Sequence, residues 1–450
     1  LGLFGSYIDI FRGIPFAAPP KTLEDPKPHP GWDGTLEAKE FKNRCMQMKL
    51  TQTDVRGSED CLYLNIWIPQ GKKQISTNLP VMIYIFGGGF LAGGSQGANF
   101  LNNYLYDGEE IAVRGNVIVV TINYRLGPLG FLSTGDENLP GNYGLKDQHM
   151  AIAWVKRNIR AFGGHGRLRS LYPNPSCFHF APQTLSPKNK GLFKRAISQS
   201  GVGVCSWAIQ RDPLLWAKKL GEKVGCPTDN TTILADCLRI SDPKTLTLAY
   251  HLQLTNLPSK SPSLHSDPSA TRGSPSSWQD SGAIARRAEV VLVPFRKGTL
   301  MRARAVTFLP FSAFSLLSQA LLFPRSGRTY SYVFSQPSRM PAYPSWVGAD
   351  HMDDLQYVFG KPFATPLGYR PKDRTVSKAM IAYWTNFART GDPSQGHSDV
   401  PVSWPAYSNK GKYYLDINNK MNKNSVKQDL RSRFVTFWNS VYLKLPQVAN

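Results

Sequence analysis

The sequence predicts an α/β fold with a mostly parallel central sheet flanked by helices. Residues 80–86 and 116–124 are continuous apolar runs rich in β-branched side chains, which is typical of strands covered on both faces. Residues 145–162 carry apolar side chains at helical spacing and are followed by Gly163 and Gly164, where a helix is expected to end. Strands that alternate with helices favour an α/β architecture.

The remaining elements follow from the same patterns. Residues 61–67 alternate as a strand does. Apolar side chains at helical spacing over residues 376–387 predict a long helix that stops at Gly391, and residues 434–442 predict a last, aromatic-rich helix. With 450 residues, 41% of them apolar, the chain is long enough for one large domain or two to three ordinary ones.

Two stretches interrupt this pattern. Residues 165–182 contain Pro173, Pro175 and Pro182, which are incompatible with a regular central strand or helix. Residues 251–325 are rich in Ser, Pro, Leu and Arg and show little periodicity. We expect both stretches to be divergent, disordered segments that disrupt the fold locally, because a compact domain does not normally carry so long a structureless insert.

The net charge of +22 is compatible with binding to nucleic acid, to an anionic membrane or to an acidic ligand. Ten of the basic residues lie in residues 251–330, against Asp267, Asp280 and Glu289. Because the chain has no RNP, zinc-finger or helix-turn-helix pattern, nucleic acid is not an expected partner. A solvated surface charge is the simpler interpretation.

The six cysteines include two closely spaced pairs. Cys45 and Cys61 lie 16 positions apart, and Cys226 and Cys237 lie 11 apart. Neither pair has the spacing of a zinc site and no histidine cluster lies nearby, so no metal is expected. Two short disulfide loops are the natural interpretation if the protein is secreted.

Three further features bear on localisation. Asn230-Thr231-Thr232 is a glycosylation sequon beside the second cysteine pair, although such sequons also arise by chance. Residues 1–5 lack the features of a signal peptide, and no apolar run reaches the length of a transmembrane helix. Together with the cysteines, the sequon favours an oxidising, secretory setting for a mature form or a fragment.

Four motifs occur in order along the chain. They are Glu59-Asp60-Cys61-Leu62-Tyr63-Leu64-Asn65-Ile66-Trp67, then Gly87-Gly88-Gly89-Phe90, then the segments 123–131 and 141–148, and finally Gly348-Ala349-Asp350-His351. Together they resemble the type-B carboxylesterase and cholinesterase family, whereas any one alone is weak. Residues 98–108 and 358–363 resemble a branch of that family that bile salts activate. The match covers residues 1–164, 183–250 and 326–450.

The resemblance implies a single α/β-hydrolase domain over residues 1–450 that is secreted and needs no cofactor. It implies hydrolysis of carboxylic esters, such as cholesteryl esters and acylglycerols, by a Ser-His-acid triad with bile salt as activator. It also implies that the cysteine pairs 45–61 and 226–237 are bridged. Arg44 resembles a family position linked to bile-salt binding, and its alternative role is that of a solvated surface charge.

Ester hydrolysis by this fold requires a serine on a tight strand-to-helix elbow, a histidine, an acid and backbone N–H donors for the oxyanion. The resemblance assigns the oxyanion loop to Gly88 and Gly89 and the histidine to His351. A third donor follows the serine in the family, and that position is lost here.

No serine stands where the nucleophile is expected. Counting forward from the helix places the elbow at Pro175, and counting back from the point where the resemblance resumes places it at Asn174. Ser176 lacks the glycines that an elbow needs. Ser95, in the literal pattern Gly93-Gly94-Ser95-Gln96-Gly97, is rejected because no helix opens after it. Ser200 fails the spacing.

The acid is missing as well. It falls between serine and histidine in chain order, inside the replaced stretch, where Asp280 and Glu289 have no matching context. The sharp edges of both divergent stretches, and the Pro/Ser/Leu/Phe/Cys-rich composition of residues 165–182, suggest retained intron or wrongly joined exon sequence. The family's Pro-rich C-terminal repeats do not follow Asn450, which suggests truncation.

We therefore expect an ester hydrolase by descent that is inactive as written. Two alternatives stay open. One is a catalytically dead relative kept as a binding or adhesion module. The other is a basic surface that binds anionic lipid or a heparin-like glycan.

Overall fold

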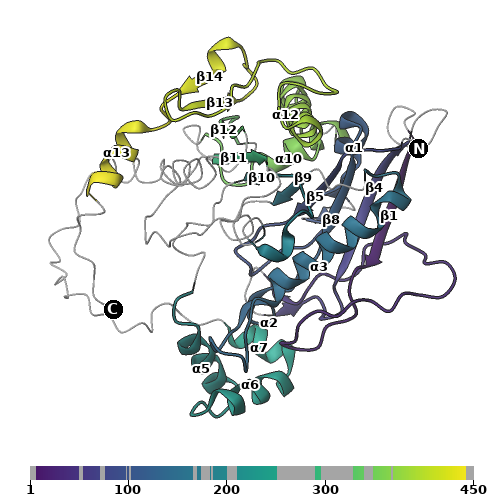
Figure 1. Ribbon diagram of the computed structural model, residues 1–450, viewed down its shortest axis with the longest axis vertical. Coiled ribbons are helices and arrows are strands. Elements are labelled where there is room, and N and C mark those ends of the chain that lie inside the picture. The colour runs from purple at the N-terminus through teal and green to yellow at the C-terminus, as the bar shows by residue number, and fades with distance from the viewer. Residues whose placement is uncertain are drawn as a thin grey trace.

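The computed structural model describes residues 7–49, 54–70, 77–97, 99–100, 103–165, 170–173, 183, 186–199, 210–250, 289–294, 328–338, 348–365 and 368–441. Among these residues, ten strands form one sheet in the order β1-β4-β8-β5-β9-β10-β11-β12-β13-β14 (Figure 1). Their bounds are β1 Tyr7–Pro15, β4 Tyr63–Gln70, β8 Ile118–Ile122, β5 Val81–Ile85, β9 Ser170–Pro173, β10 Arg195–Gln199, β11 Glu289–Pro294, β12 Tyr330–Phe334, β13 Tyr413–Ile417 and β14 Val426–Gln428.

Two short hairpins and the helices complete the described part. The hairpins are β2 Gln47–Met48 with β3 Val55–Arg56, and β6 Asn99–Phe100 with β7 Asn103–Tyr104. The helices are α1 Glu109–Gly115, α2 Gly127–Phe131, α3 Tyr143–Asn158, α5 Pro213–Lys223, α6 Thr231–Ile240, α7 Pro243–Ala249, α10 Leu355–Val358, α11 Lys361–Ala364, α12 Pro371–Thr390 and α13 Ser432–Val441, with 3₁₀ turns η2 Ile159–Phe162, η3 Pro187–Asn189 and η6 Lys423–Ser425. Figure 1 shows α5, α6 and α7 gathered at one end of the molecule and β13, β14 and α13 at the other.

The predicted elements form for the expected reasons. Every residue of β5 and β8 is buried, and the two strands pair in parallel. The helix that begins at α3 continues through η2 and ends at Gly163, whose φ of 76° favours glycine. Helix α12 likewise ends at Gly391, with φ 88°. The α/β fold class is confirmed.

The parallel pairings are concentrated at the centre of the sheet. Strands β8, β5, β9 and β10 run parallel to one another, and β12 pairs in parallel with β13. The other five pairings within this sheet are antiparallel. Because β11 is antiparallel to both β10 and β12, β12 points the same way as β5. The carboxyl ends of β5, β8, β9, β10 and β12 therefore lie at one edge.

The expectation that neither divergent stretch contains regular structure is wrong at two places. Residues 170–173 form β9, which pairs with β5 and β10 in the middle of the sheet. Pro173 is tolerated because it is the last residue of that strand, where the ladder ends in any case. Residues 289–294 form β11. The run Val290-Val291-Leu292-Val293 does not alternate, which is compatible with a central strand, because such a strand is covered on both faces. The other residues of both stretches, apart from His165, lie outside the described part.

The core surrounds this sheet. Three tryptophans, Trp67, Trp384 and Trp404, are almost completely buried in its main cluster. A second, smaller cluster holds α5, α6 and α7 against α2 and includes Leu129, Leu234 and Leu246. No helix of the described chain combines the length and hydropathy needed to cross a membrane.

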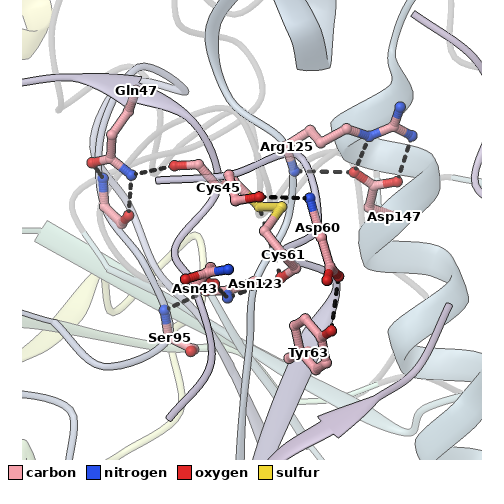
Figure 2. The surroundings of a disulfide bond; sticks show 12 residues. Asn43, Cys45, Gln47, Asp60, Cys61, Tyr63, Ser95, Asn123, Arg125 and Asp147 are labelled. Carbon is pink, nitrogen blue, oxygen red and sulfur yellow. Dashed lines mark hydrogen bonds and ion pairs between the residues drawn. A yellow bond between two sulfur atoms is a disulfide. The ribbon is translucent and has the colours of Figure 1, made fainter. Parts of the chain in front are cut away.

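One buried ion pair connects the segment after β8 to α3. The guanidinium of Arg125 donates from Nε and Nη2 to the two carboxylate oxygens of Asp147, at 2.8 and 2.7 Å, and the Arg125 backbone N–H donates to the same carboxylate at 3.0 Å (Figure 2). Arg125 Nη1 also donates to the carbonyl of Glu24. The two side chains are 2% and 0% exposed, so each charge depends on the other for compensation.

A buried carboxyl anchors the chain that follows β12. Asp354, which is fully buried, accepts from Gln199 Nε2 at 2.6 Å and from the Tyr332 hydroxyl at 3.2 Å. Its other oxygen has no hydrogen-bond partner among the described residues. Burial raises the pKa of Asp354 to about 6, although the bonds from Tyr332 and Gln199 oppose the shift. The loop that carries His351 is thereby tied to β10 and β12.

We expect Asp147→Asn to lower the free energy of unfolding by about 3–5 kcal/mol, because it leaves the buried Arg125 charge uncompensated. Urea denaturation followed by tryptophan fluorescence measures the loss. The matched control is Asp25→Asn, which removes an exposed partner of Lys146 and should cost less than about 1 kcal/mol. Equal losses in the two variants would contradict the structural importance of the buried pair.

We expect Asp354→Asn to gain stability relative to the unsubstituted chain as the pH rises. A pKa raised from 3.8 to about 6 means that folding favours protonated Asp354, so its stabilisation is complete below about pH 4 and is lost as the pH rises through about 6. The amide keeps an acceptor for Gln199 and cannot ionise. The difference in unfolding free energy should therefore move by about 3 kcal/mol in the variant's favour between about pH 4 and about pH 7. Urea denaturation across that range tests this, and a flat difference would refute it.

Candidate active site

The loop after β5 has the backbone that an oxyanion loop needs. Gly88, Gly89 and Phe90 have φ values of 131°, 61° and 63°. A Cβ on Gly88 would lie 1.9 Å from the carbonyl oxygen of Ala92, so glycine is required there. Both glycines are exposed, and their N–H groups donate to no other described residue. These N–H groups are therefore free to bind a substrate oxygen.

The segment after β8 holds this loop from behind. The Tyr124 hydroxyl donates to the Phe86 carbonyl at 2.9 Å, and the Gly127 N–H donates to the Phe90 carbonyl at 2.7 Å. The rings of Phe90 and Phe131 pack with centroids 4.2 Å apart. Two motifs that are distant in sequence, 87–90 and 123–131, are thus one physical unit.

The first disulfide loop clamps the end of the same turn. Cys45 is bonded to Cys61, and Gln47, which is almost fully buried, donates to the carbonyl of Cys45 at 2.9 Å. The Gln47 amide also donates to the Gly93 carbonyl at 2.7 Å and accepts from the Gly93 N–H at 2.9 Å. Figure 2 shows this arrangement beside the disulfide. Sequence patterns did not single out Gln47, because its role depends on a contact 46 positions away.

Ser95 lies inside the protein. Its side chain is 2% exposed, its hydroxyl accepts from Asn65 Nδ2 at 3.1 Å, and its N–H donates to Asn123 Oδ1 at 2.9 Å. Asn65 and Asn123 further bond to Thr121 and to the Cys61 carbonyl. Ser95 therefore belongs to a buried polar network that connects the sheet with the first disulfide loop.

Arg44 is half-buried beside this network. Its guanidinium donates to the Gly97 carbonyl, and its stem lies against Gly94. Burial and the positive charge of Arg56 lower the pKa of Arg44, against the opposing influence of Tyr106 and Tyr104. Two guanidinium groups close together favour an anionic partner.

His351 lies in the segment that follows β12, a strand whose carboxyl end is at the same edge of the sheet as that of β5. Asp350 and Asp353 shape the loop, because the Asp350 N–H donates to Asp353 at 2.7 Å and the His351 N–H donates to Asp350 at 2.8 Å. The ring is exposed and bonds to no other described residue, yet the surrounding chain is dense enough that desolvation lowers the pKa of His351, while Asp350 raises it.

The two halves of the site start from well-separated strands. Strands β9, β10 and β11 lie between β5 and β12, so at about 4.8 Å per strand the two strand ends are roughly 19 Å apart. A site shared by His351 and Gly89 would therefore require the loops that follow the two strands to bridge this distance.

Strand β9 leads to the expected elbow position. It ends at Pro173, at the carboxyl edge of the sheet and between β5 and β10. The expected nucleophile positions, together with Ser176 and Ser200, lie outside the described residues, as does Asp280. Glu289 begins β11 opposite Val333, which places it at the same edge of the sheet.

The second disulfide loop belongs to the smaller core cluster, which also includes Leu129 of α2. Cys226, which follows α5, is bonded to Cys237 within α6. Asn230 is exposed and caps α6, its Oδ1 accepting from the N–H groups of Thr232 and Ile233. Both disulfides are therefore present in the structure with the pairing that the family resemblance implies.

Sequence comparison finds relatives that match over the whole length of this chain. Bile salt-activated lipases of Bos taurus and Homo sapiens are 53% and 51% identical over 100% of this chain, which spans 86% and 68% of them. An acetylcholinesterase of Bungarus fasciatus is 28% identical over 99% of this chain and 84% of its own length. The alignment with the bovine lipase has 517 positions, so at least 67 of them have no counterpart among the 450 residues here.

A model of the carboxylesterase family matches residues 4–268 and 305–438. The unmatched residues 269–304 fall inside the second divergent stretch. The match runs through residues 165–182, where the motifs alone indicated a break. These two segments together cover most of the sequence, and this chain belongs to the carboxylesterase family.

Proposed function

We propose that this chain binds lipid esters and bile salts at the oxyanion edge of the sheet and does not hydrolyse them. The observation that carries the proposal is the end of β9 at Pro173. The strand that would present a nucleophile is in place between β5 and β10, but Asn174 and Pro175 follow it where a serine is required.

Pro175 also opposes the turn itself. A nucleophile elbow is a sharp, strained turn between strand and helix, whereas proline holds φ near −65° and tolerates little else. Neither neighbour of Ser176 is a glycine, so that serine lacks the small residues that relieve such a turn. A shift of register by one or two residues therefore does not restore a nucleophile.

The retained groups support binding rather than turnover. The free N–H groups of Gly88 and Gly89 suit the carbonyl oxygen of an ester, and such donors stabilise an oxyanion by about 3–4 kcal/mol each when a nucleophile generates one. His351 can exchange protons at the same edge. Without a serine that His351 can deprotonate, these groups have no covalent step to assist.

Arg44 supports a bile-salt partner. Bile salts pair an anionic tail with an apolar body. The charge of Arg56 acts on Arg44, whose pKa burial and that charge lower, while Tyr106 and Tyr104 oppose the shift. The relatives at 53% and 51% identity are named for activation by bile salt.

An extracellular location is the second part of the proposal. Both disulfides persist only in an oxidising compartment. Secretion would also bring the sequon at Asn230 into contact with the glycosylation machinery.

We expect no hydrolysis of p-nitrophenyl butyrate above the rate in buffer, because a triad without its serine loses about 10⁶-fold in turnover. Release of p-nitrophenol, followed by absorbance, measures this. Ser95→Ala and His351→Ala should match the unsubstituted chain. If the chain hydrolyses the ester and either Ser95→Ala or His351→Ala abolishes that hydrolysis, the proposal is wrong.

We expect Arg44→Gln to weaken taurocholate binding by about tenfold or more, since a charge-assisted bond is worth about 1.5–3 kcal/mol. Glutamine can still donate to the Gly97 carbonyl, so the loop should keep its shape. Isothermal titration calorimetry gives the affinity. The control is Arg157→Gln, an exposed cation on α3. If both variants bind as the unsubstituted chain does, Arg44 has no role in binding.

A further inference from the structure

The second disulfide loop encloses a modification sequence. Asn230-Thr231-Thr232 is the only Asn-X-Ser/Thr sequence of the chain in which X is not proline. It lies between Cys226 and Cys237, which are bonded to each other. The acceptor asparagine is four positions from one cysteine and seven from the other.

The folded protein leaves the amide nitrogen of Asn230 available. Asn230 is exposed, and only its Oδ1 is used in capping α6, accepting from the Thr232 N–H at 2.7 Å and the Ile233 N–H at 3.4 Å. Nδ2 bonds to no other described residue. A glycan on Nδ2 leaves Oδ1 in place, so the modified side chain can still cap the helix.

Once helix α6 and the disulfide have formed, they prevent the transfer of a glycan to Asn230. The Leu234 N–H donates to the Asn230 carbonyl at 2.9 Å, and Leu234, Ala235 and Leu238 are fully buried in the second core cluster. A transferase must take the sequon into its own cleft. Residues 230–240 must therefore be unfolded at that moment, before helix α6 and the disulfide have formed.

We infer that Asn230 is N-glycosylated and that transfer precedes the folding of α6 and the closure of the Cys226–Cys237 bridge. The inference rests on the proposed secretion. In the transfer, Nδ2 forms a bond to C1 of the first sugar of a lipid-linked oligosaccharide diphosphate. The bond from C1 to the diphosphate oxygen breaks, Nδ2 loses one proton, and the lipid diphosphate leaves.

Closure of the bridge limits the time available for transfer. At about 5–20 residues per second, synthesis delivers Cys237 within about a second of Asn230. Disulfide formation takes seconds or longer. The sequon is therefore open for seconds, and glycosylation is expected to be substantial but incomplete.

The test expresses the full chain behind a cleavable secretion signal in eukaryotic cells and resolves it by electrophoresis with and without peptide-N-glycosidase. The unsubstituted chain should give two bands, of which the slower collapses on digestion. The double variant Cys226→Ser with Cys237→Ser cannot form the bridge, so more of it should run in the slower band. A pulse of dithiothreitol should have the same effect on the unsubstituted chain. The readout uses the total translocated chain, so it does not require the variants to fold.

Matched variants separate the glycan from the cap. Asn230→Asp keeps a capping oxygen and Thr232→Ala keeps Asn230, yet both should show only the faster band, whereas Thr232→Ser should keep both bands. A chain without a digestible band, with or without the bridge, overturns glycosylation. Complete occupancy of the unsubstituted chain agrees with the inferred order, because every chain is then modified before the bridge closes. Incomplete occupancy that loss of the bridge leaves unchanged overturns the order of events. The added signal imposes translocation, so failure of the natural protein to appear outside the cell would refute only the proposed secretion.

Discussion

The buried contact between Arg125 and Asp147 holds the segment that supports the turn after β5. The ion pair is excluded from water on all sides, which makes it costly to break and directional when intact. It fixes the chain immediately after β8 onto α3. The neighbouring residues Tyr124 and Gly127 then hold the turn after β5 through bonds to Phe86 and Phe90. The turn that contains Gly88 and Gly89 is therefore supported by a charge pair that lies outside the turn itself.

The segment that carries His351 is held in place by a different interaction. Asp354 ties the His351 loop to β10 and β12 through Gln199 and Tyr332, and it does so as a buried acid whose pKa is raised. Strands β9, β10 and β11 lie between the two anchored segments.

The divergent stretches illustrate why composition alone misjudges a strand. Three prolines in residues 165–182 argue against a central strand, yet β9 occupies residues 170–173 because its only proline is the last residue. Strand β11 arises from a Val-rich run in a stretch without periodicity, because a strand covered on both faces needs no alternation. Glu289 had no matching context in sequence, and strand pairing places it at the edge of the site.

The sequence by itself determined the fold class, the family motifs and the cysteine spacing, since each depends on residue type and local order. The helix ends at Gly163 and Gly391 are also local, because glycine alone adopts a positive φ without strain. Only the tertiary structure decided that Gln47 clamps Gly93, that Ser95 is a buried network residue and that Asp354 anchors the histidine loop. Those roles come from contacts between residues 30 to 155 positions apart, and the physical reason is that sheet pairing, which no local pattern encodes, brings these side chains out of water together.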